Sequence, residues 1–234
     1  MPSARPEPAR TLARATTPRG DIALRCRETQ GGGTAYELIV GGVFAMDTVD
    51  VSTEVELAGL GLAACAQPRR VLVGGLGLGF TARAVLEDPR VADVVIAEIE
   101  PALVGWARDG LVPTLTGVVG DPRVRLHTGD VADLLTGDET FDVILLDVDN
   151  GPSFLVHQDN SSLYADPTLA RALAQLAPGG ALAIWAAQPE PGLLARLAAL
   201  ADRLGGLEVR EIARTVEREG RTLTYATYQA LAAG

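Results

Sequence analysis

Three acidic residues stand where catalytic or ligand-binding carboxylates are commonly found in α/β proteins. Glu98, Asp130 and Asp147 each come at or shortly after the end of a short run rich in Val, Ile and Leu. A carboxylate in such a place can accept ribose hydroxyls, meet an amino group, or take a proton from an amine. Because the carboxyl ends of parallel strands meet at one edge of a sheet, we expect the three acids to share a binding crevice.

A glycine-rich segment, Gly75-Leu-Gly77-Leu-Gly79, directly follows the earliest of these runs, Val71–Val73. Glycine allows a tight turn and a close approach of the backbone to a ligand, and the next helix would point its free N–H groups at the same place. By itself the segment also fits a plain strand–helix turn, and Gly77-x-Gly79-x-x-Ala82 fits the dinucleotide fingerprint. Glu98 could accept the ribose hydroxyls of a nicotinamide dinucleotide or of an adenosyl cofactor, so this residue does not separate the two.

Strands and helices are predicted to alternate from about Ser52 onward, which indicates a Rossmann-like, doubly wound, mostly parallel sheet of the α/β class. Two β-rich runs near the end, Leu207–Val216 and Thr222–Leu231, predict a C-terminal antiparallel hairpin, typical of class I methyltransferase-like folds. The predicted parallel strands are Val71–Val73, Val94–Ile96, Val124–His127, Phe141–Asp147 and Ala181–Trp185, and helices are expected at about Ser52–Ala66, at Phe80–Leu86, from Pro101, from Asp166 to the Pro178–Gly180 turn, and from Pro191 to Gly205.

The chain is expected to fall into three parts. Residues 1–20, rich in Pro, Ala and Arg, are predicted to be a flexible tail. Residues 21–51 are predicted to be a small N-terminal β region, because the candidate strands Ile22–Leu24 and Tyr36–Val40 are separated by a Gly-Gly-Gly turn. Residues 52–234 are predicted to be the Rossmann-like nucleoside-binding catalytic domain.

Composition limits the function classes. Hydrophobic residues make up 47% of the 234 residues, which excludes a mainly disordered chain. The net charge of −10 argues against a nucleic-acid partner. Cys26 and Cys65 have no metal-type spacing, so no metal is expected. Since no apolar run reaches the length of a membrane span and no secretory signal is visible, we expect a cytoplasmic protein with reduced thiols and no membrane partner.

Taken as an ordered set, several segments resemble the successive motifs of the spermidine synthase family. Those segments are Val71–Gly79, Ala97–Glu100, Leu126–Asp130 and Phe141–Asp147. Leu38–Val43 is similar to the family's N-terminal β-hairpin region, so the resemblance covers about residues 21–234. It implies a donor that is decarboxylated S-adenosylmethionine or S-adenosylmethionine itself, a small-molecule amine acceptor, and a homodimer or larger homo-oligomer.

The resemblance also implies roles for individual residues. Glu98 would hold the ribose, with Ile99 beside it in the nucleoside site. Asp130 and Val131 would line the adenine. Asp147 would be the base that frees the attacking amine.

Several positions depart from the family's pattern, all of them in the part that would hold the reacting groups. Leu78 replaces an Asp of the glycine-rich loop, and Ala45 replaces a Gln. Glu54-Val55 stands where the family has a Tyr-His pair. The family's Asp-Ser-Ser-Asp reads Asp147-Val-Asp149-Asn150 here, so we expect Asp149 and Asn150 to lie in the acceptor site, with Asp149 partly compensating for the missing acid.

Four functions remain open at this stage. The first is transfer of an aminopropyl-type group to an amine. The second is methyl transfer from S-adenosylmethionine on the same scaffold. The third is a non-catalytic nucleoside-binding protein. A nicotinamide oxidoreductase comes last, because Asp130, Asp147 and the terminal hairpin would be unexplained.

Overall fold

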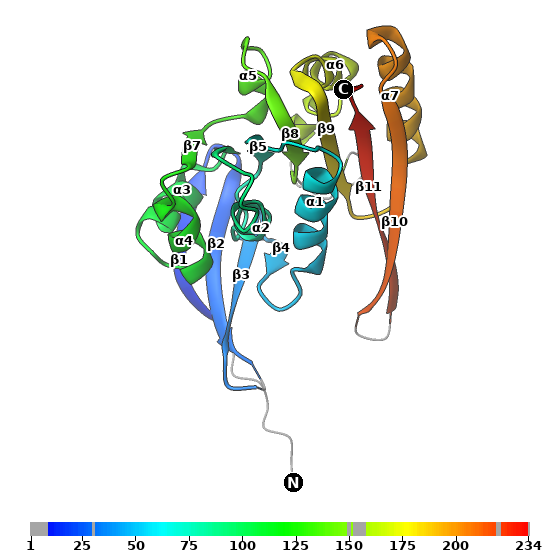
Figure 1. Ribbon diagram of the computed structural model, residues 1–234. Coiled ribbons are helices and arrows are strands. Elements are labelled where there is room, and N and C mark those ends of the chain that lie inside the picture. Colours follow the sequence, from blue (N-terminus) through cyan, green and yellow to red (C-terminus); the bar gives the residue numbers. More distant parts are fainter. Residues whose placement is uncertain (1–8, 30, 149–150, 152–157, 219–220, 234) are drawn as a thin grey trace.

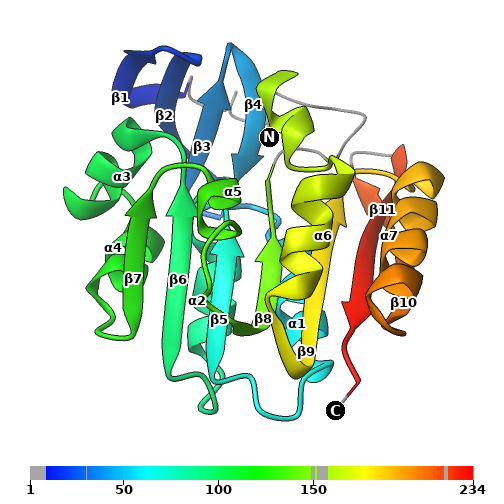
Figure 2. The ribbon, with the colours of Figure 1, turned by 90° about the horizontal axis from the view of Figure 1, so that it is seen from above.

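The computed structural model describes residues 9–29, 31–148, 151, 158–218 and 221–233, which form two β-sheets and a set of helices (Figure 1). The smaller sheet is antiparallel, with strands in the order β1-β2-β3-β4. It stands beyond the carboxyl ends of the parallel strands of the larger sheet (Figure 2). Its strands are β1 Arg10–Thr17, β2 Gly20–Glu28, β3 Thr34–Val40 and β4 Val43–Asp47.

The larger sheet has seven strands in the order β10-β11-β9-β8-β5-β6-β7. The five strands from β9 to β7 are parallel, and β11 and β10 are added antiparallel at the β9 edge. This arrangement confirms the predicted Rossmann-like fold class with its C-terminal hairpin. The strands are β5 Arg70–Gly74, β6 Asp93–Glu98, β7 Val124–Thr128, β8 Phe141–Leu146, β9 Leu176–Ala186, β10 Glu208–Arg218 and β11 Arg221–Leu231.

Helices cover both faces of the larger sheet, α1 to α4 on one face and α5 to α7 on the other (Figure 2). The central strands are apolar along their whole length because both of their faces are buried, as in β8, where Val143 to Leu146 are fully buried. The helices are α1 Ser52–Ala63, α2 Phe80–Leu86, α3 Pro101–Arg108, α4 Pro113–Gly120, α5 Val131–Leu134, α6 Asp166–Ala174 and α7 Pro191–Leu204, with a 3₁₀ turn, η1, at Gln158–Ser162.

The chain reverses its direction across the sheet between β5 and β8. From β5 the chain moves outward through β6 to β7, and it then returns to β8 and continues through β9 on the other side. Doubly wound sheets bind ligands at such a switch point, outside the carboxyl ends of the strands. The antiparallel sheet covers this same edge (Figure 2).

The predicted flexible tail is wrong from Arg10 onward, because Arg10–Thr17 is strand β1 and Gly20 begins β2. The two strands pair antiparallel around a tight turn in which Gly20 has φ 116°. Strand β1 carries mainly Thr, Ala and Arg, so its side chains give a weak apolar signal, and pairing of its backbone with β2 supplies the order.

The sequence predicted a helix that ends at Pro178–Gly180, and this prediction is wrong. Helix α6 already ends at Ala174, and β9 begins at Leu176. A register shift in the pairing of β8 with β9 absorbs these residues, and a Cβ on Gly180 would lie 2.9 Å from the carbonyl oxygen of Asp142. Glycine is needed here because β8 passes this close, a role that glycine plays in strands as well as in turns.

Helix α1 packs closely on the larger sheet because of one glycine. Gly61 is buried, and a Cβ at this position would collide with the Cδ2 methyl of Leu145 and lie 3.1 Å from Val143 of β8. Gly59 lies on the exposed side of the same helix, where a Cβ would meet nothing within 4 Å. The two glycines therefore share a helix and differ in their surroundings, since Gly61 faces side chains of β8 and Gly59 faces solvent.

We expect Gly59→Ala to raise the free energy of unfolding by up to about 1 kcal/mol, since alanine is the better helix former. Gly61→Ala gains the same propensity but overpacks the core, which costs about 1–3 kcal/mol. Urea unfolding followed by circular dichroism should therefore place Gly61→Ala below Gly59→Ala. Equal stabilities for the two variants would contradict the close packing of α1 on β8.

Candidate functional site

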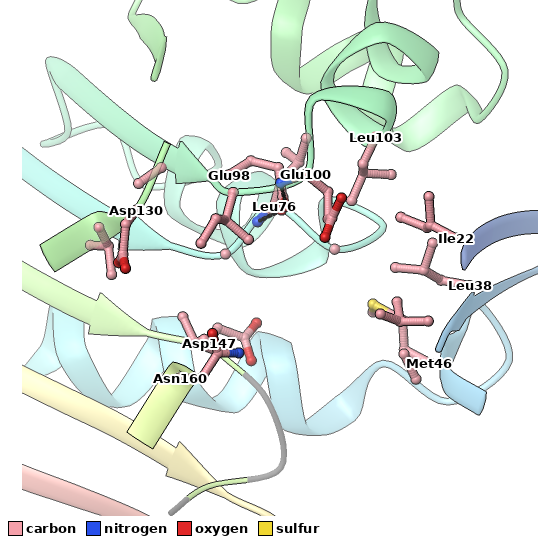
Figure 3. Close-up of a pocket in the computed structure, with 18 of the residues that line it drawn as sticks. Ile22, Leu38, Met46, Leu76, Glu98, Glu100, Leu103, Asp130, Asp147 and Asn160 are labelled. Atoms are coloured by element: carbon pink, nitrogen blue, oxygen red, sulfur yellow. Dashed lines mark hydrogen bonds between the residues drawn. The ribbon is translucent and has the colours of Figure 1, made fainter. Parts of the chain in front are cut away.

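A cavity lies at the carboxyl edge of the parallel strands, between the two sheets. Its floor comes from the ends of β5, β6 and β8, and its outer wall from apolar side chains of the antiparallel sheet, among them Ile22, Leu38 and Met46 (Figure 3). Met46 also accepts a hydrogen bond at its sulfur from the Leu78 N–H (3.2 Å), which ties β4 to the glycine-rich loop. Both the small β region and the larger sheet therefore build this site.

The glycine-rich loop lets three strand ends come together. Gly75 has φ +96°, and a Cβ there would collide with the carbonyl oxygen of Asp147. The Gly75 N–H donates to the carbonyl of Ala97 (2.8 Å), and the Asp147 N–H donates to the carbonyl of Gly74 (2.9 Å). Only glycine adopts this conformation at so short a distance. The loop therefore fixes the position of Asp147 relative to the end of β6.

The other two loop glycines differ in their surroundings. Gly77 lines the cavity with φ +49°, and a Cβ there would lie 2.8 Å from the sulfur of Met46. Gly79 is the N-cap residue of α2, with φ +88°, and faces Leu115 of α4, so it is not among the residues that line the cavity. Gly79 thus shapes the turn into the helix.

Glu98 is the last residue of β6, and it is only 6% exposed. Its Oε2 accepts the Leu76 N–H (3.0 Å), and its Oε1 accepts the Glu100 N–H (2.8 Å). Burial raises the pKa of this carboxyl, while the backbone N–H groups lower it. The Gly77 N–H also contributes to holding this carboxyl. Two carboxylate oxygens offer about four acceptor sites, so Glu98 can still receive a ligand hydroxyl.

Asp130 follows β7 and caps the short helix α5, because its Oδ1 accepts the Ala132 N–H (2.9 Å). Asp130 lines the cavity on the same side as Glu98 (Figure 3). Ile99 and Val131 line it as well, next in sequence to these two acids. The structure therefore brings together the residues that the sequence assigned to a nucleoside.

Asp147 follows the last residue of β8 and lies across the cavity from Glu98 (Figure 3). Its Oδ2 accepts the hydroxyl of Thr81 on α2 (2.5 Å). Burial, and after it the negative charge of Glu54, raise the pKa of Asp147 from the ordinary 3.8 to about 7, and the Thr81 hydrogen bond opposes them. At neutral pH the carboxyl is therefore close to half ionised. Asp149 and Asn150, which we predicted beside it, lie outside the described residues.

Sequence reasoning missed four polar residues that line the cavity, and Thr81, which donates to Asp147 from α2. The four are Arg19, Glu54, Glu100 and Asn160. Arg19 lies in the turn between β1 and β2 and extends over the cavity, where its Nε lies 3.4 Å from Glu100 and its Nη2 donates to Asn160 of η1 (2.5 Å). The only sequence signal for Glu54 was its departure from the family's Tyr. The other contacts depend on packing between distant segments.

The cavity is strongly acidic. Its described lining includes five carboxyl side chains (Glu54, Glu98, Glu100, Asp130 and Asp147) and one guanidinium, that of Arg19. The remaining walls are mainly apolar and include Trp185, whose ring stacks on Tyr225 with centroids 5.7 Å apart. Such a cavity favours a ligand that carries positive charge on an otherwise apolar or hydroxylated body.

The described residues contain no group of three or more His, Cys, Asp or Glu side chains that could hold a metal ion. None of the helices in this part of the chain is long and apolar enough to cross a membrane.

Comparison with known proteins gives a consistent result. A family model described as "Spermine/spermidine synthase domain" matches residues 51–191. The chain is 34% identical over 145 residues to a polyamine aminopropyltransferase of Nitrosomonas europaea, a match that covers 59% of this chain and 42% of that protein. It is 31% identical over 125 residues to a polyamine aminopropyltransferase of Mycobacterium tuberculosis (strain CDC 1551 / Oshkosh), covering 52% of this chain and 23% of that protein. These matches thus span less than half of either relative.

Solved structures show the same fold. A spermidine synthase in complex with the transition-state analogue AdoDATO superimposes with a TM-score of 0.76 at 19% identity, over 95% of this chain and 73% of that one. The spermidine synthase from Thermotoga maritima gives a TM-score of 0.73 at 18% identity, over 95% and 72% of the two chains.

The raised pKa of Asp147 predicts a specific dependence of stability on pH. Between pH 3.8 and about 7 the folded protein holds a proton that the unfolded chain releases, so the free energy of unfolding falls as the pH rises through this window. Asp147→Asn removes this effect. Raising a pKa from 3.8 to about 7 corresponds to at most about 4 kcal/mol, and solvent that reaches this partly exposed residue through the cavity lowers that figure.

Urea unfolding of both proteins from pH 4 to pH 8 checks this expectation. Asp147→Asn should become progressively more stable than the parent up to about pH 7, after which the difference should stay constant. A difference that does not change with pH would show that Asp147 ionises in the ordinary range.

Proposed function

The chain belongs to the spermine/spermidine synthase family, and on this premise we propose that it transfers an aminopropyl group from decarboxylated S-adenosylmethionine to a small-molecule amine. The observation that carries the proposal is the placement of Asp147 opposite Glu98 and Asp130 in one acidic cavity. Asp147, a candidate base, thus lies across the cavity from Glu98 and Asp130, which suit a nucleoside. Localisation in the cytoplasm and assembly into a dimer or larger oligomer remain predictions.

Glu98, Ile99, Asp130 and Val131 are proposed to hold the adenosine half of the donor. Glu98 is proposed to accept a ribose hydroxyl with the acceptor capacity that its backbone hydrogen bonds leave open. Asp130 lies at the end of the next parallel strand, where its carboxylate can accept from the adenine amino group while Val131 packs on the ring. Gly75 and Gly77 let the donor approach the backbone of the loop.

The charge of the cavity favours the decarboxylated donor. S-adenosylmethionine carries a carboxylate, which would be repelled by a cavity lining in which the carboxyl side chains outnumber the single Arg19 guanidinium, even with Asp147 only partly ionised. The decarboxylated form lacks that group and carries a sulfonium and an ammonium, both positive. Arg19 is already engaged with Glu100 and Asn160.

Asp147 is proposed to act as the general base. A primary amine has a pKa of about 10.4 and must lose a proton before it attacks. The amine nitrogen then forms a bond to the carbon beside the sulfonium, the carbon–sulfur bond breaks, and its electron pair stays on sulfur, which leaves as the neutral thioether methylthioadenosine. A base with a pKa near 7 is better matched to an amine than one with a pKa of 3.8.

An assay of products tests this function. The full chain is offered decarboxylated S-adenosylmethionine or S-adenosylmethionine with a panel of amines, and nucleosides and amines are followed by mass spectrometry. We expect methylthioadenosine and an amine that has gained an aminopropyl group. The rate should rise with pH as Asp147 ionises around pH 7, and Asp147→Asn should lower turnover by about 100-fold or more.

The other products separate the alternatives. S-adenosylhomocysteine with a methylated product would replace aminopropyl transfer by methyl transfer on the same scaffold. Binding of methylthioadenosine with no product from any amine would favour a non-catalytic nucleoside-binding protein. Full turnover by Asp147→Asn would remove Asp147 as the base.

The nucleoside site is tested separately by Glu98→Gln. The substitution removes the charge that strengthens the ribose hydrogen bonds and replaces one of the two oxygens that accept backbone N–H groups by an NH2 group, so methylthioadenosine should bind about 10- to 100-fold more weakly, and circular dichroism checks that the fold is kept. Calorimetry measures this dissociation constant, with Glu28→Gln at the exposed end of β2 as the matched control. If Glu98→Gln binds methylthioadenosine as tightly as the control does, Glu98 does not hold the ribose.

A further inference from the structure

Thr81 donates the one hydrogen bond that the Asp147 side chain receives from the described residues. Thr81 lies in the first turn of α2 and is only 3% exposed, and its hydroxyl lies 2.5 Å from Oδ2 of Asp147. The other oxygen, Oδ1, receives no hydrogen bond from this part of the chain. Asp147 lines the cavity, so it has one oxygen held by the protein and one that can meet a ligand.

The glycine-rich loop and the residues on either side of it hold both the backbone and the side chain of Asp147. The Asp147 N–H donates to the carbonyl of Gly74 (2.9 Å), which precedes the loop, and Thr81 follows the loop. Gly79, with φ +88°, turns the chain into α2 between these two contacts. The place of Asp147 and the orientation of its carboxylate therefore depend on the same short segment.

The electrostatic surroundings of Asp147 show why this hydrogen bond matters. Burial, and after it the negative charge of Glu54 on α1, raise the pKa of Asp147 to about 7. The Thr81 hydroxyl lowers the pKa of Asp147, because it donates to the ionised form. A general base must be ionised to accept a proton, so Thr81 favours the form of Asp147 that the reaction needs.

The other charged groups of the cavity do not replace Thr81. The remaining carboxyl groups of the described lining are those of Glu98, Glu100 and Asp130. Their negative charges oppose ionisation of Asp147. Arg19, the cation of this lining, pairs with Glu100 (3.4 Å). Within the described residues, support for the ionised form of Asp147 therefore comes from Thr81.

We propose that Thr81 is a positioning residue, in that its hydroxyl holds Oδ2 of Asp147 and leaves Oδ1 to take the proton of the reacting amine. This inference rests on the proposed function. Thr81 is not among the residues that line the cavity, so it acts through Asp147 and not on a substrate. The proton that leaves the amine nitrogen goes to Oδ1, and the hydroxyl stays on Oδ2 before and after this transfer.

Urea unfolding of the full chain from pH 4 to pH 9 tests the inference without requiring turnover. The quantity measured is the difference in unfolding free energy between a protein and its Asp147→Asn variant. In the parent this difference should stop growing at about pH 7. With Thr81→Val, the folded state keeps its extra proton to a higher pH, so the difference should grow for roughly one further pH unit.

Two variants serve as controls. Thr81→Ser keeps the hydroxyl and should restore the behaviour of the parent. Thr116→Val, on α4 and away from the cavity lining, removes a hydroxyl that donates to the carbonyl of Val112 (3.2 Å), and should leave the pH dependence as it is in the parent. Circular dichroism checks the fold of each variant.

Turnover gives a second measurement, with decarboxylated S-adenosylmethionine and the amine of the panel that reacts fastest. At pH 7, Thr81→Val should be at least about 5-fold slower than the parent. This loss should shrink toward pH 9, because Asp147 is then ionised in both proteins. A loss of equal size at pH 7 and pH 9, or a stability difference that still stops growing at about pH 7 in Thr81→Val, would overturn the inference.

The two measurements also separate this inference from the proposed reaction. If Thr81→Val extends the stability difference to higher pH but the parent transfers no aminopropyl group to any amine, Thr81 still holds Asp147 and the proposed reaction is rejected.

Discussion

The site depends on one close backbone contact, between Gly75 and the carbonyl of Asp147. A side chain at Gly75 would collide with that carbonyl, and hydrogen bonds on either side link Gly75 to Ala97 and Asp147 to Gly74. The ends of β5, β6 and β8 are therefore held together as one rigid surface. Glu98 and Asp147 project from this surface and not from independent loops, so the distance between a bound nucleoside and its base is set by the backbone.

Gathering carboxylates on such a surface has an electrostatic consequence. Burial raises the pKa values of Glu98 and Asp147, and the negative charges of Glu100 and Glu54 add to this, which weakens the folded state near neutral pH. The same repulsion prepares the cavity for a cationic donor and a cationic acceptor. The repulsion between these acids therefore destabilises the empty site, and a bound cation would relieve it. Functional sites commonly contain ionisable groups with shifted pKa values of this kind.

Much of this arrangement could be predicted from the sequence, because the order of a parallel sheet determines which strand ends meet. Glu98, Asp130 and Asp147 stand at or just beyond the ends of strands that the pattern of apolar residues identified correctly. Arg19 could not be predicted, since its contacts with Glu100 and Asn160 join segments far apart in the chain. Strand β1 was missed because its small and polar side chains give only a weak apolar pattern. The place of Glu54 depends on the packing of α1 on β8 through Gly61.

A crystal structure of the protein with methylthioadenosine bound tests the central claim most directly. We expect the ribose hydroxyls on Glu98, the adenine beside Asp130, and the thioether end of the nucleoside toward Asp147. A nucleoside bound outside this cavity, or one whose adenine faces Asp147, would contradict the account, because the strand ends would then hold the ligand in a different order.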